Sequence, residues 1–209
     1  MDAPASAALF TLTRRGFLGR IAPALAAVAV VGLPFRPRLA AAGELLETPS
    51  DDEGPFYREG APARSDMRRK DSTTFPMALS GLVRAEDGKA LPGVTLDLWQ
   101  ADSGGHYDND SREFRYRGKI VTDKDGRFRF DTNVPGQYSL GGGQKRPKHV
   151  HVKLSGAGLY DLTTQMYFDV RPGVDVAEEL FVPLQWTGEG QARSATGAWN
   201  PILSRKPAK

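Results

Sequence analysis

From Met77 onward, short runs of apolar residues alternate with turn residues. The run T-L-D-L-W (95–99) and the run R-F-R-F-D (127–131) alternate apolar and polar side chains. Successive side chains of a β-strand point to opposite faces, so this period of two predicts half-buried strands. Turn residues such as Asp87-Gly88 and Pro135-Gly136 separate the runs.

Taken together, these runs predict an all-β protein, with a single β-sandwich or barrel domain over residues 77–209. No segment shows a long helical period, and only Asp175 to Leu180 is expected to form one short helical turn. Residues 43–76 lack sustained alternation, so we expect an extended N-terminal arm there. The polar stretch from Gly188 onward is expected to wrap the surface.

The first 42 residues differ in character from the rest. Paired Arg14-Arg15 precede an apolar stretch (21–34), and the small residues Ala40 to Ala42 follow it. This layout predicts a twin-arginine-type export signal, cleaved near Ala42, and a periplasmic or extracellular product. The alternative is a membrane anchor, but the stretch is shorter than the ~20 residues of a span. We therefore expect no stable membrane insertion after cleavage.

Charge and cysteine content narrow the possible partners. The chain of 209 residues has a formal net charge of +3, and residues 1–42 hold five arginines and one aspartate. The remainder is therefore near neutral, which argues against nucleic acid as a partner. The chain has no cysteine, so disulfides cannot stabilise it and the core must do so, with a metal as a further source of stability.

His149 and His151 are the first indication of chemistry. On a strand, residues two apart share a face, so both imidazoles can reach one metal ion while Val150 points away. Tyr107 and Tyr138 precede them in glycine-marked segments. A phenol with a pKa of ~10 ionises at neutral pH only beside strong positive charge, which a trivalent ion supplies. If both tyrosines bind, Fe(III) is the natural metal; zinc or copper stays an alternative, and the H-x-H spacing alone is a weak signal.

Six segments in order, between Glu53 and about Asp169, extend this picture. They are E-G-P-F-Y, L-W-Q-A-D-S-G-G-H-Y, R-G-K-I-V-T-D-K-D-G-R-F-R-F-D-T, V-P-G-Q-Y, R-P-K-H-V-H and T-T-Q-M-Y-F. Together they resemble the intradiol ring-cleavage dioxygenases, typified by protocatechuate 3,4-dioxygenase and catechol 1,2-dioxygenase. The resemblance implies a β-sandwich with one non-haem Fe(III) per chain, held between loops and strand ends.

The resemblance also implies roles for individual residues. Tyr107 and His151 fall at the equatorial ligands of that family, and Tyr138 and His149 at the axial ones. Arg146 falls at an active-site arginine and Gln165 at the glutamine beside it. The family's substrate pocket is lined by a segment that corresponds to Gly54, Pro55 and Tyr57.

The implied reaction takes a catechol-type small molecule and O2 to a muconate-type diacid, by cleavage between the hydroxyl-bearing carbons. Tyr138 would accept a substrate proton. Arg146 would stabilise negative charge that develops on the ring, and Gln165 would orient either Arg146 or the bound oxygen species. The oligomeric state is left open, with a homo-oligomer among the alternatives.

A rival hypothesis is a non-catalytic β-sandwich binding module. Residues 80–99 resemble the prealbumin-like repeats of extracellular proteins. Such a module has no reason to carry Tyr138 together with R-P-K-H-V-H, which separates the two hypotheses. Trp99 and Tyr167 are expected to be packing residues under either one.

Overall fold

The computed structural model describes residues 45–168 and 176–207. The predicted export signal and its cleavage near Ala42 lie outside the described residues. The described segments form short strands and two 3-10 turns, in this order: β1 Pro76–Leu82, β2 Arg84–Ala85, β3 Thr95–Gln100, β4 Arg117–Val121, β5 Arg127–Asn133, β6 Ser139–Gly141, β7 Gln144–Lys145, β8 His149–Ser155, β9 Leu162–Tyr167, η1 Glu178–Leu180, β10 Gln185–Thr187, η2 Gly190–Ala192, β11 Ser194–Ala198 and β12 Ile202–Leu203.

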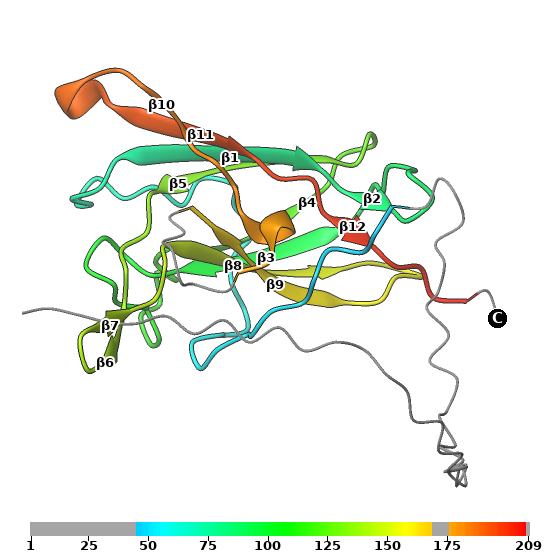
Figure 1. Cartoon of the computed structure of the whole chain (residues 1–209), viewed down its shortest axis with the longest axis horizontal. Coiled ribbons are helices and arrows are strands. Elements are labelled where there is room, and N and C mark those ends of the chain that lie inside the picture. Colours follow the sequence, from blue (N-terminus) through cyan, green and yellow to red (C-terminus); the bar gives the residue numbers. More distant parts are fainter. Residues whose placement is uncertain (1–44, 169–175, 208–209) are drawn as a thin grey trace, which may run out of the picture. The chain divides into compact units, whose positions relative to one another are not determined.

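Two four-stranded sheets make up the body of the molecule (Figure 1). One has the strand order β10-β11-β1-β5 and the other the order β4-β3-β8-β9, and the pairs β12-β2 and β6-β7 are separate. The predicted β-sandwich is therefore confirmed. The helical turn expected before Leu180 is present as η1, and Asp175 itself lies outside the described residues.

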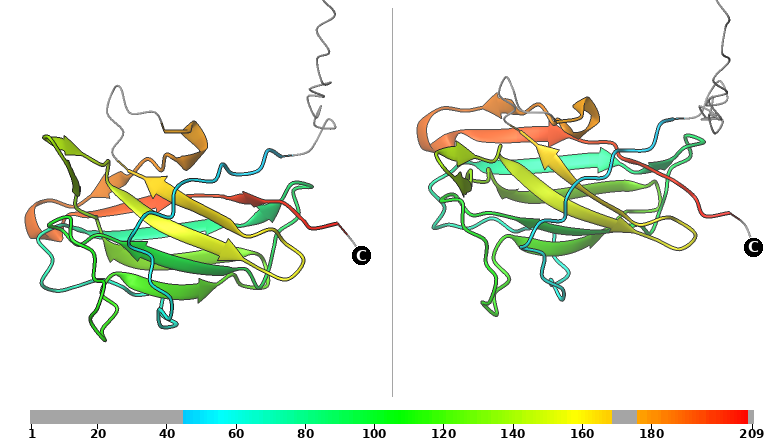
Figure 2. Two further views of the ribbon diagram at one scale, coloured as in Figure 1. Left: turned by 90° about the horizontal axis from the view of Figure 1, so that it is seen from below. Right: turned by 60° about the horizontal axis from the view of Figure 1, so that its bottom comes forward.

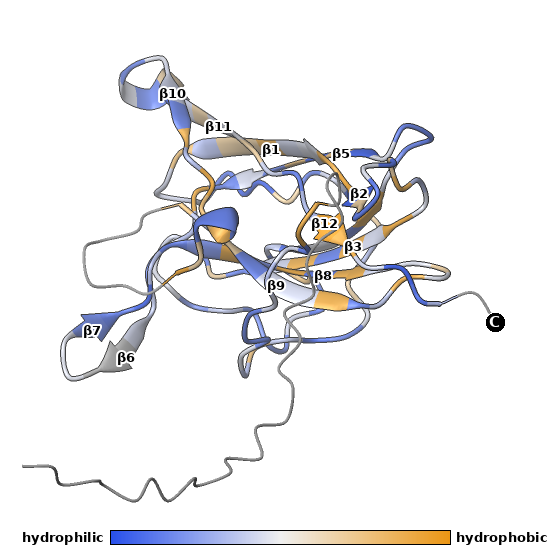
Figure 3. Ribbon diagram, turned by 45° about the vertical axis from the view of Figure 1, so that its right-hand side comes forward, coloured by the Kyte–Doolittle hydropathy of each residue, from blue (hydrophilic) through white to orange (hydrophobic). Residues whose placement is uncertain are grey.

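The core lies between the two sheets. Alternate residues of β5, Phe128 and Phe130, are buried while Arg127 and Arg129 are exposed, as the period of two predicts. From the other sheet, β3 and β8 contribute Leu96, Leu98 and Val152, among others. In Figure 3 the hydrophilic colour lies on β7 and on the tip of the β10–β11 hairpin, both away from this core.

The C-terminal stretch does not wrap the surface, so that expectation was wrong. Strand β11 lies between β10 and β1, pairing in parallel with β1 from Met77↔Ala195 onward. The side chains of Trp199 and Leu203 are buried in the core. Most residues of this segment are polar or small, and a few large apolar ones, such as Trp199 and Leu203, anchor it in the core.

Strand β3 is buried on both faces, whereas its alternating pattern predicted one polar, half-exposed face. Asp97 and Trp99 point away from the core, yet their exposed fractions are only 6% and 1%. The N-terminal arm covers them: it runs across the outer face of β8 and β9 (Figure 2). Hydrogen bonds hold the arm there, including Asp51 N–H to the Thr163 carbonyl at 3.0 Å.

Within residues 45–168 and 176–207, no helix has both the length and the apolar character that a membrane crossing requires.

Candidate metal centre and active site

Three of the predicted metal-ligating side chains meet at one point on the covered face of the β4-β3-β8-β9 sheet. The hydroxyl oxygen of Tyr107 lies 3.1 Å from Nε2 of His149 and 3.1 Å from Nε2 of His151. The two Nε2 atoms are themselves 3.1 Å apart. One phenol oxygen and two imidazole nitrogens therefore form a nearly equilateral triangle, called the donor triangle below.

His149 is held in one tautomer by its own loop. Its Nδ1 lies 2.6 Å from the carbonyl oxygen of Pro147. Carbonyl oxygen only accepts, so the single proton of the neutral ring is on Nδ1, and Nε2 keeps its lone pair. Burial lowers the pKa of His149 to about 4, against a smaller upward effect of the Pro147 carbonyl. The ring is therefore neutral at pH 7, as a metal ligand must be.

His151 is oriented by Trp99. Their rings stack with centroids 4.8 Å apart and an angle of 5° between the planes. The stacking follows from the strand register, because Trp99 and His151 are direct partners across β3 and β8. Burial, followed by the neighbouring His149 and Arg146, lowers the pKa of His151 to about 2. The sequence predicts only a packing role for Trp99, because the register that places it opposite His151 is set by the pairing of β3 with β8.

Tyr107 reaches the triangle from the loop after β3. Burial, followed by Tyr138, raises the pKa of the Tyr107 phenol, whereas Arg146 and Arg117 lower it. Burial has the larger effect, so the phenol stays protonated unless a cation lies beside its oxygen. Phe56 of the arm stacks on the ring, with centroids 4.3 Å apart and an interplanar angle of 13°.

Tyr138 borders the donor triangle. Its ring centroid is 5.9 Å from that of Tyr107 and 5.8 Å from that of His149, both in edge-to-face contact. Phe56 meets its edge at 5.8 Å. The structure therefore brings all four predicted ligands into one cluster of rings, with three donor atoms converging and the fourth residue beside them.

The donor triangle fits a single metal ion. Protein nitrogen and oxygen ligands bind metals at about 2.0–2.2 Å, and two such bonds at a right angle place their donors roughly 3 Å apart. The 3.1 Å sides match that separation. In the described part of the chain, no three His, Cys, Asp or Glu side chains come together as a metal site. The imidazole pair is completed by a phenol oxygen, a donor that favours a hard, highly charged ion.

Arg146 and Gln165 also lie together, beside the triangle. Nη2 of Arg146 donates to Oε1 of Gln165 at 3.0 Å and to the hydroxyl of Tyr167 at 2.9 Å. Gln165 is the register partner of His151, and Tyr167 that of His149. Arg146 lowers the pKa of both imidazoles, so its positive charge acts on the centre itself.

Tyr167 is buried, as expected of a packing residue, but its hydroxyl also forms two hydrogen bonds. Its hydroxyl donates to Oδ2 of Asp51, 2.8 Å away on the arm, while it accepts from Arg146. Burial and this hydrogen bond to Asp51 raise the pKa of Tyr167, so the phenol stays protonated. The sequence held one usable signal: Tyr167 follows Gln165 by two residues and so shares its face of β9.

The E-G-P-F-Y segment of the arm divides into two parts. Gly54 lies against the site: a Cβ built on it would be 3.6 Å from Cε1 of His151. Pro55 follows it and is exposed. Phe56, which sequence analysis left without a role, covers Tyr107 and Tyr138.

Tyr57 points elsewhere. Its hydroxyl donates to Oδ2 of Asp97 at 3.1 Å, and its ring meets Trp99 edge to face at 5.0 Å. Burial, followed by the charge of Asp97, raises the pKa of Tyr57 to about 12. Tyr57 therefore contacts Asp97 and Trp99, and it supports the indole that stacks on His151.

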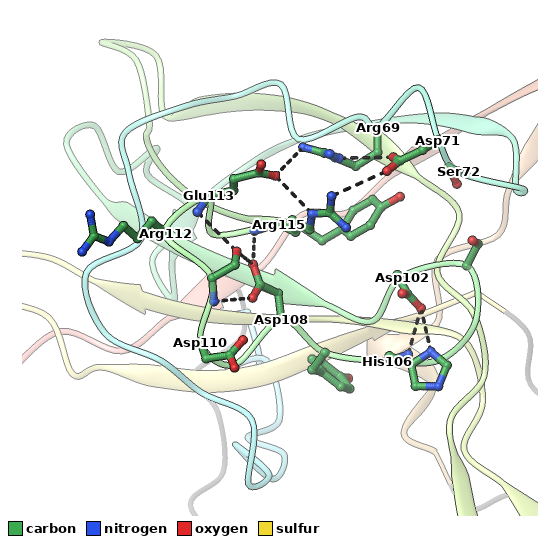
Figure 4. A pocket seen from close by; sticks show the side chains of 14 residues that line it. Arg69, Asp71, Ser72, Asp102, His106, Asp108, Asp110, Arg112, Glu113 and Arg115 are labelled. Carbon is green, nitrogen blue, oxygen red and sulfur yellow. Dashed lines mark hydrogen bonds and ion pairs between the residues drawn. The ribbon is translucent and has the colours of Figure 1, made fainter.

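A cavity of about 640 Å³ opens beside Tyr107 (Figure 4). Its walls are polar and come from the loop 102–116 and from residues 69–72, and of the predicted site residues only Tyr107 lines it. Arg69 and Arg115 form ion pairs with Glu113 and Asp71 there, all at partly exposed positions. Such exposed ion pairs contribute little to stability. The convergent metal donors lie in the donor triangle and not in this cavity.

Comparison with known proteins identifies dioxygenases as relatives of this chain. Residues 52–178 match the family model Dioxygenase_C, described as "Dioxygenase". A chlorocatechol 1,2-dioxygenase of Pseudomonas sp. (strain P51) is 31% identical over 163 residues, covering 66% of this chain and 65% of that protein. A catechol 1,2-dioxygenase 2 of Acinetobacter lwoffii is 34% identical over 178 residues, covering 76% of this chain and 65% of that protein.

Solved structures agree with the sequence comparisons. The 3-chlorocatechol 1,2-dioxygenase of Rhodococcus opacus superposes with a TM-score of 0.69 at 29% identity, covering 76% of this chain and 73% of that one. The dioxygenase domain of a carbohydrate-binding fusion protein of Streptomyces sp. SirexAA-E has a TM-score of 0.64 at 34% identity, covering 76% and 99%. The chain thus belongs to the intradiol dioxygenase family, and it spans 65% of the length of the two curated relatives described above.

Proposed function

We propose that this protein is a non-haem iron dioxygenase that cleaves a catechol-type ring between its two hydroxyl-bearing carbons. O2 is the second substrate and a muconate-type diacid is the product. The observation that carries the proposal is the donor triangle of Tyr107, His149 and His151, with sides of 3.1 Å, in a chain of the dioxygenase family. Catechol-type rings are chosen because the relatives are catechol and chlorocatechol 1,2-dioxygenases.

Fe(III) is the metal we assign to the centre, held by Tyr107, His149, His151 and Tyr138. The phenol oxygen favours a hard trivalent ion, because burial opposes ionisation of Tyr107 and only a strong positive charge reverses this. When bound, the ferric ion supplies Lewis acidity toward a coordinated catechol and brings ring and O2 together.

The chain's own residues have three tasks in this reaction. Tyr138, at the border of the triangle, accepts a proton from a catechol hydroxyl at its phenolate oxygen and becomes a neutral phenol. Arg146, fixed by Gln165, stabilises negative charge as it develops on the ring. Phe56 covers the rings of Tyr107 and Tyr138 and keeps water from that side of the site.

Two measurements test the proposal. Protein loaded with ferric iron should show a visible phenolate-to-iron charge-transfer band and should consume O2 when catechols are added. The muconate-type product should appear in step with O2 loss. Colourless protein that holds no iron, or iron-loaded protein that consumes no O2 with any catechol offered, would overturn it.

The rival hypotheses give different results with the same protein. A non-catalytic prealbumin-like module predicts that Tyr138→Phe changes neither colour nor activity. A zinc or copper site predicts the corresponding metal, without the phenolate-to-iron band, in protein purified from its native host. Elemental analysis of that protein distinguishes the three.

We propose in addition that the protein acts outside the cytoplasm. The support is in the sequence: Arg14-Arg15, the apolar stretch 21–34 and the small residues before Gly43. Full-length protein expressed in a bacterium with twin-arginine export should be recovered outside the cytoplasm with a new N-terminus near Ala42. Replacing Arg14 and Arg15 with lysine should retain it inside; export that is unaffected by this change would contradict the proposal.

A further inference from the structure

Arg146 is fixed by more than Gln165. Its Nη2 amino group carries two protons, and both are used: one hydrogen bond goes to Gln165 at 3.0 Å and the other to Tyr167 at 2.9 Å. Its Nε–H is buried and has no partner among the described residues. Two acceptors therefore hold one end of the guanidinium, and the Nε–H is left as a donor for a bound molecule.

Both acceptors are in turn directed by the N-terminal arm. Nε2 of Gln165 donates to the carbonyl oxygen of Asp52 at 2.8 Å, which turns Oε1 toward Arg146. The hydroxyl of Tyr167 has one proton, and it donates this proton to Oδ2 of Asp51 at 2.8 Å. Its lone pairs are then left to accept from Arg146. Without the carboxylate of Asp51, this hydroxyl proton could rotate toward the guanidinium and oppose it.

We propose that Tyr167 and Asp51 are positioning residues for Arg146, so that the N-terminal arm sets the orientation of the active-site guanidinium. The inference rests on the proposed function, in which Arg146 stabilises charge on the substrate ring. Neither residue is assigned contact with substrate. Asp51 acts through Tyr167, and Tyr167 acts through Arg146.

The geometry explains why a chain of three groups is used. Arg146 lies in the turn between β7 and β8, where its backbone N–H donates to the Tyr138 carbonyl oxygen at 3.0 Å. A long side chain on such a turn has many rotamers. Tyr167 is 2% exposed and is packed at the end of β9, so it offers a rigid acceptor. Its ring also lies beside that of His149, with centroids 5.5 Å apart, which places the guanidinium near the metal donors.

The experiment uses iron-loaded full-length protein with the variants Y167F, D51A and D51N. A lost hydrogen bond to a charged group corresponds to about a tenfold effect or more. We expect Y167F to lower kcat for catechol about tenfold with KM within roughly twofold, since the contact matters when charge develops. D51A should approach Y167F, and D51N should be milder because its amide oxygen still accepts. Iron content and the charge-transfer band should stay unchanged.

Two double variants decide whether the groups act in series. Y167F/D51A should be no slower than Y167F, and Y167F should have no further effect in an R146A background. Additive losses in either pair, or a KM effect without a kcat effect, would overturn the proposal. The matched controls are Y160F and D87N, at exposed positions remote from the site, which should keep wild-type kinetics.

A second readout does not need activity. In the metal-free protein, R146A and Y167F should each lower the thermal midpoint by a few degrees, given about 2–4 °C per kcal/mol at this size. The double variant should show less than the sum of the two shifts. If no catechol is cleaved, the proposed function fails, yet this thermal cycle still decides the hydrogen-bond chain. Additive thermal shifts would overturn the positioning role.

Discussion

The Nε2 atoms of His149 and His151 lie 3.1 Å apart, although the two rings are held by quite different neighbours. His149 is fixed through Nδ1 by the carbonyl of Pro147, and His151 is fixed by the stacked indole of Trp99. The planes of the two imidazoles are inclined at 78° to one another. The close approach of the two Nε2 atoms therefore depends on two independent contacts, one with the Pro147 carbonyl and one with the Trp99 indole.

Tyr107→Phe removes one of the three donor atoms while keeping the ring that stacks on Phe56. We expect the iron content of the purified protein to fall at least tenfold, because even changes beside metal ligands cost about 10–100-fold in affinity. Elemental analysis and the visible spectrum measure this. Tyr160→Phe serves as the matched control and should keep full iron. A Y107F protein with full iron content would remove Tyr107 from the ligand set.

The stability of the metal-free protein should fall as the pH falls. The folded-state pKa values of His149 and His151 are lowered to about 4 and about 2, from 6.5 in the unfolded chain. Between pH 6.5 and 4 the unfolded state therefore binds protons that the folded state does not. Stability is present above pH 6.5 and is lost below it, by up to about 1.4 kcal/mol per pH unit for each ring.

Urea unfolding of metal-free protein at pH 7, 6, 5 and 4 measures this loss. H149Q should reduce the slope of the unfolding free energy against pH, because only one buried imidazole is then left to bind a proton on unfolding. Y160F, an exposed substitution that leaves both buried imidazoles in place, should keep the slope. A free energy of unfolding that stays constant or rises over this range would show that the imidazoles are not buried as described.

Gly54→Ala should lower the stability of the protein without lowering its iron binding. Gly54 has φ = 70°, and its added Cβ would lie 3.6 Å from Cε1 of His151, an ordinary contact distance. The penalty is therefore in the backbone, about 1–2 kcal/mol for a left-handed alanine. Gly88→Ala is a matched control with φ = 80° and open space around the new Cβ. Both should lower the thermal midpoint similarly and bind iron equally; iron loss in G54A alone would show that the glycine keeps space at the site.

Gly81→Ala should be far more damaging, for a steric reason. A Cβ at Gly81 would lie 1.7 Å from the carbonyl oxygen of Trp199 and 2.8 Å from Cζ of Phe128. The first clash is with backbone, so no side-chain rotation relieves it. We expect a loss of about 3 kcal/mol or more, or failure to fold. Gly158→Ala, with nothing near its new Cβ, should cost only the backbone term; a folded G81A protein of near wild-type stability would contradict the close approach.

Much of the fold followed from local pattern. The alternating runs at 95–99 and 127–131 lie in strands, as the period of two predicted, because alternating side chains fit the pleat of a sheet. Pairing was not predictable in the same way. β11 joins β1 from more than 100 residues away, and its polar composition gave no sign that it would lie inside a sheet.

The site, like the fold, has parts that local sequence predicts and parts that only packing sets. The sequence by itself determined the donors: two histidines on one face of a strand, two tyrosines in glycine-marked loops, and Arg146 and Gln165 in segments that resemble a family. Spacing within a strand fixes direction, and chemical type fixes which metal a group can bind. Those properties are local and can be read from neighbouring residues.

Only the tertiary structure decided which groups support the donors. The indole of Trp99 reaches His151 through strand register, and Asp51 meets Tyr167 across 116 positions of the chain. The arm then buries the polar face of β3, whose pattern predicted exposure. Contacts of this kind depend on how separate elements pack, because a side chain's partner is set by the position of another strand or arm and not by its own neighbours in the sequence.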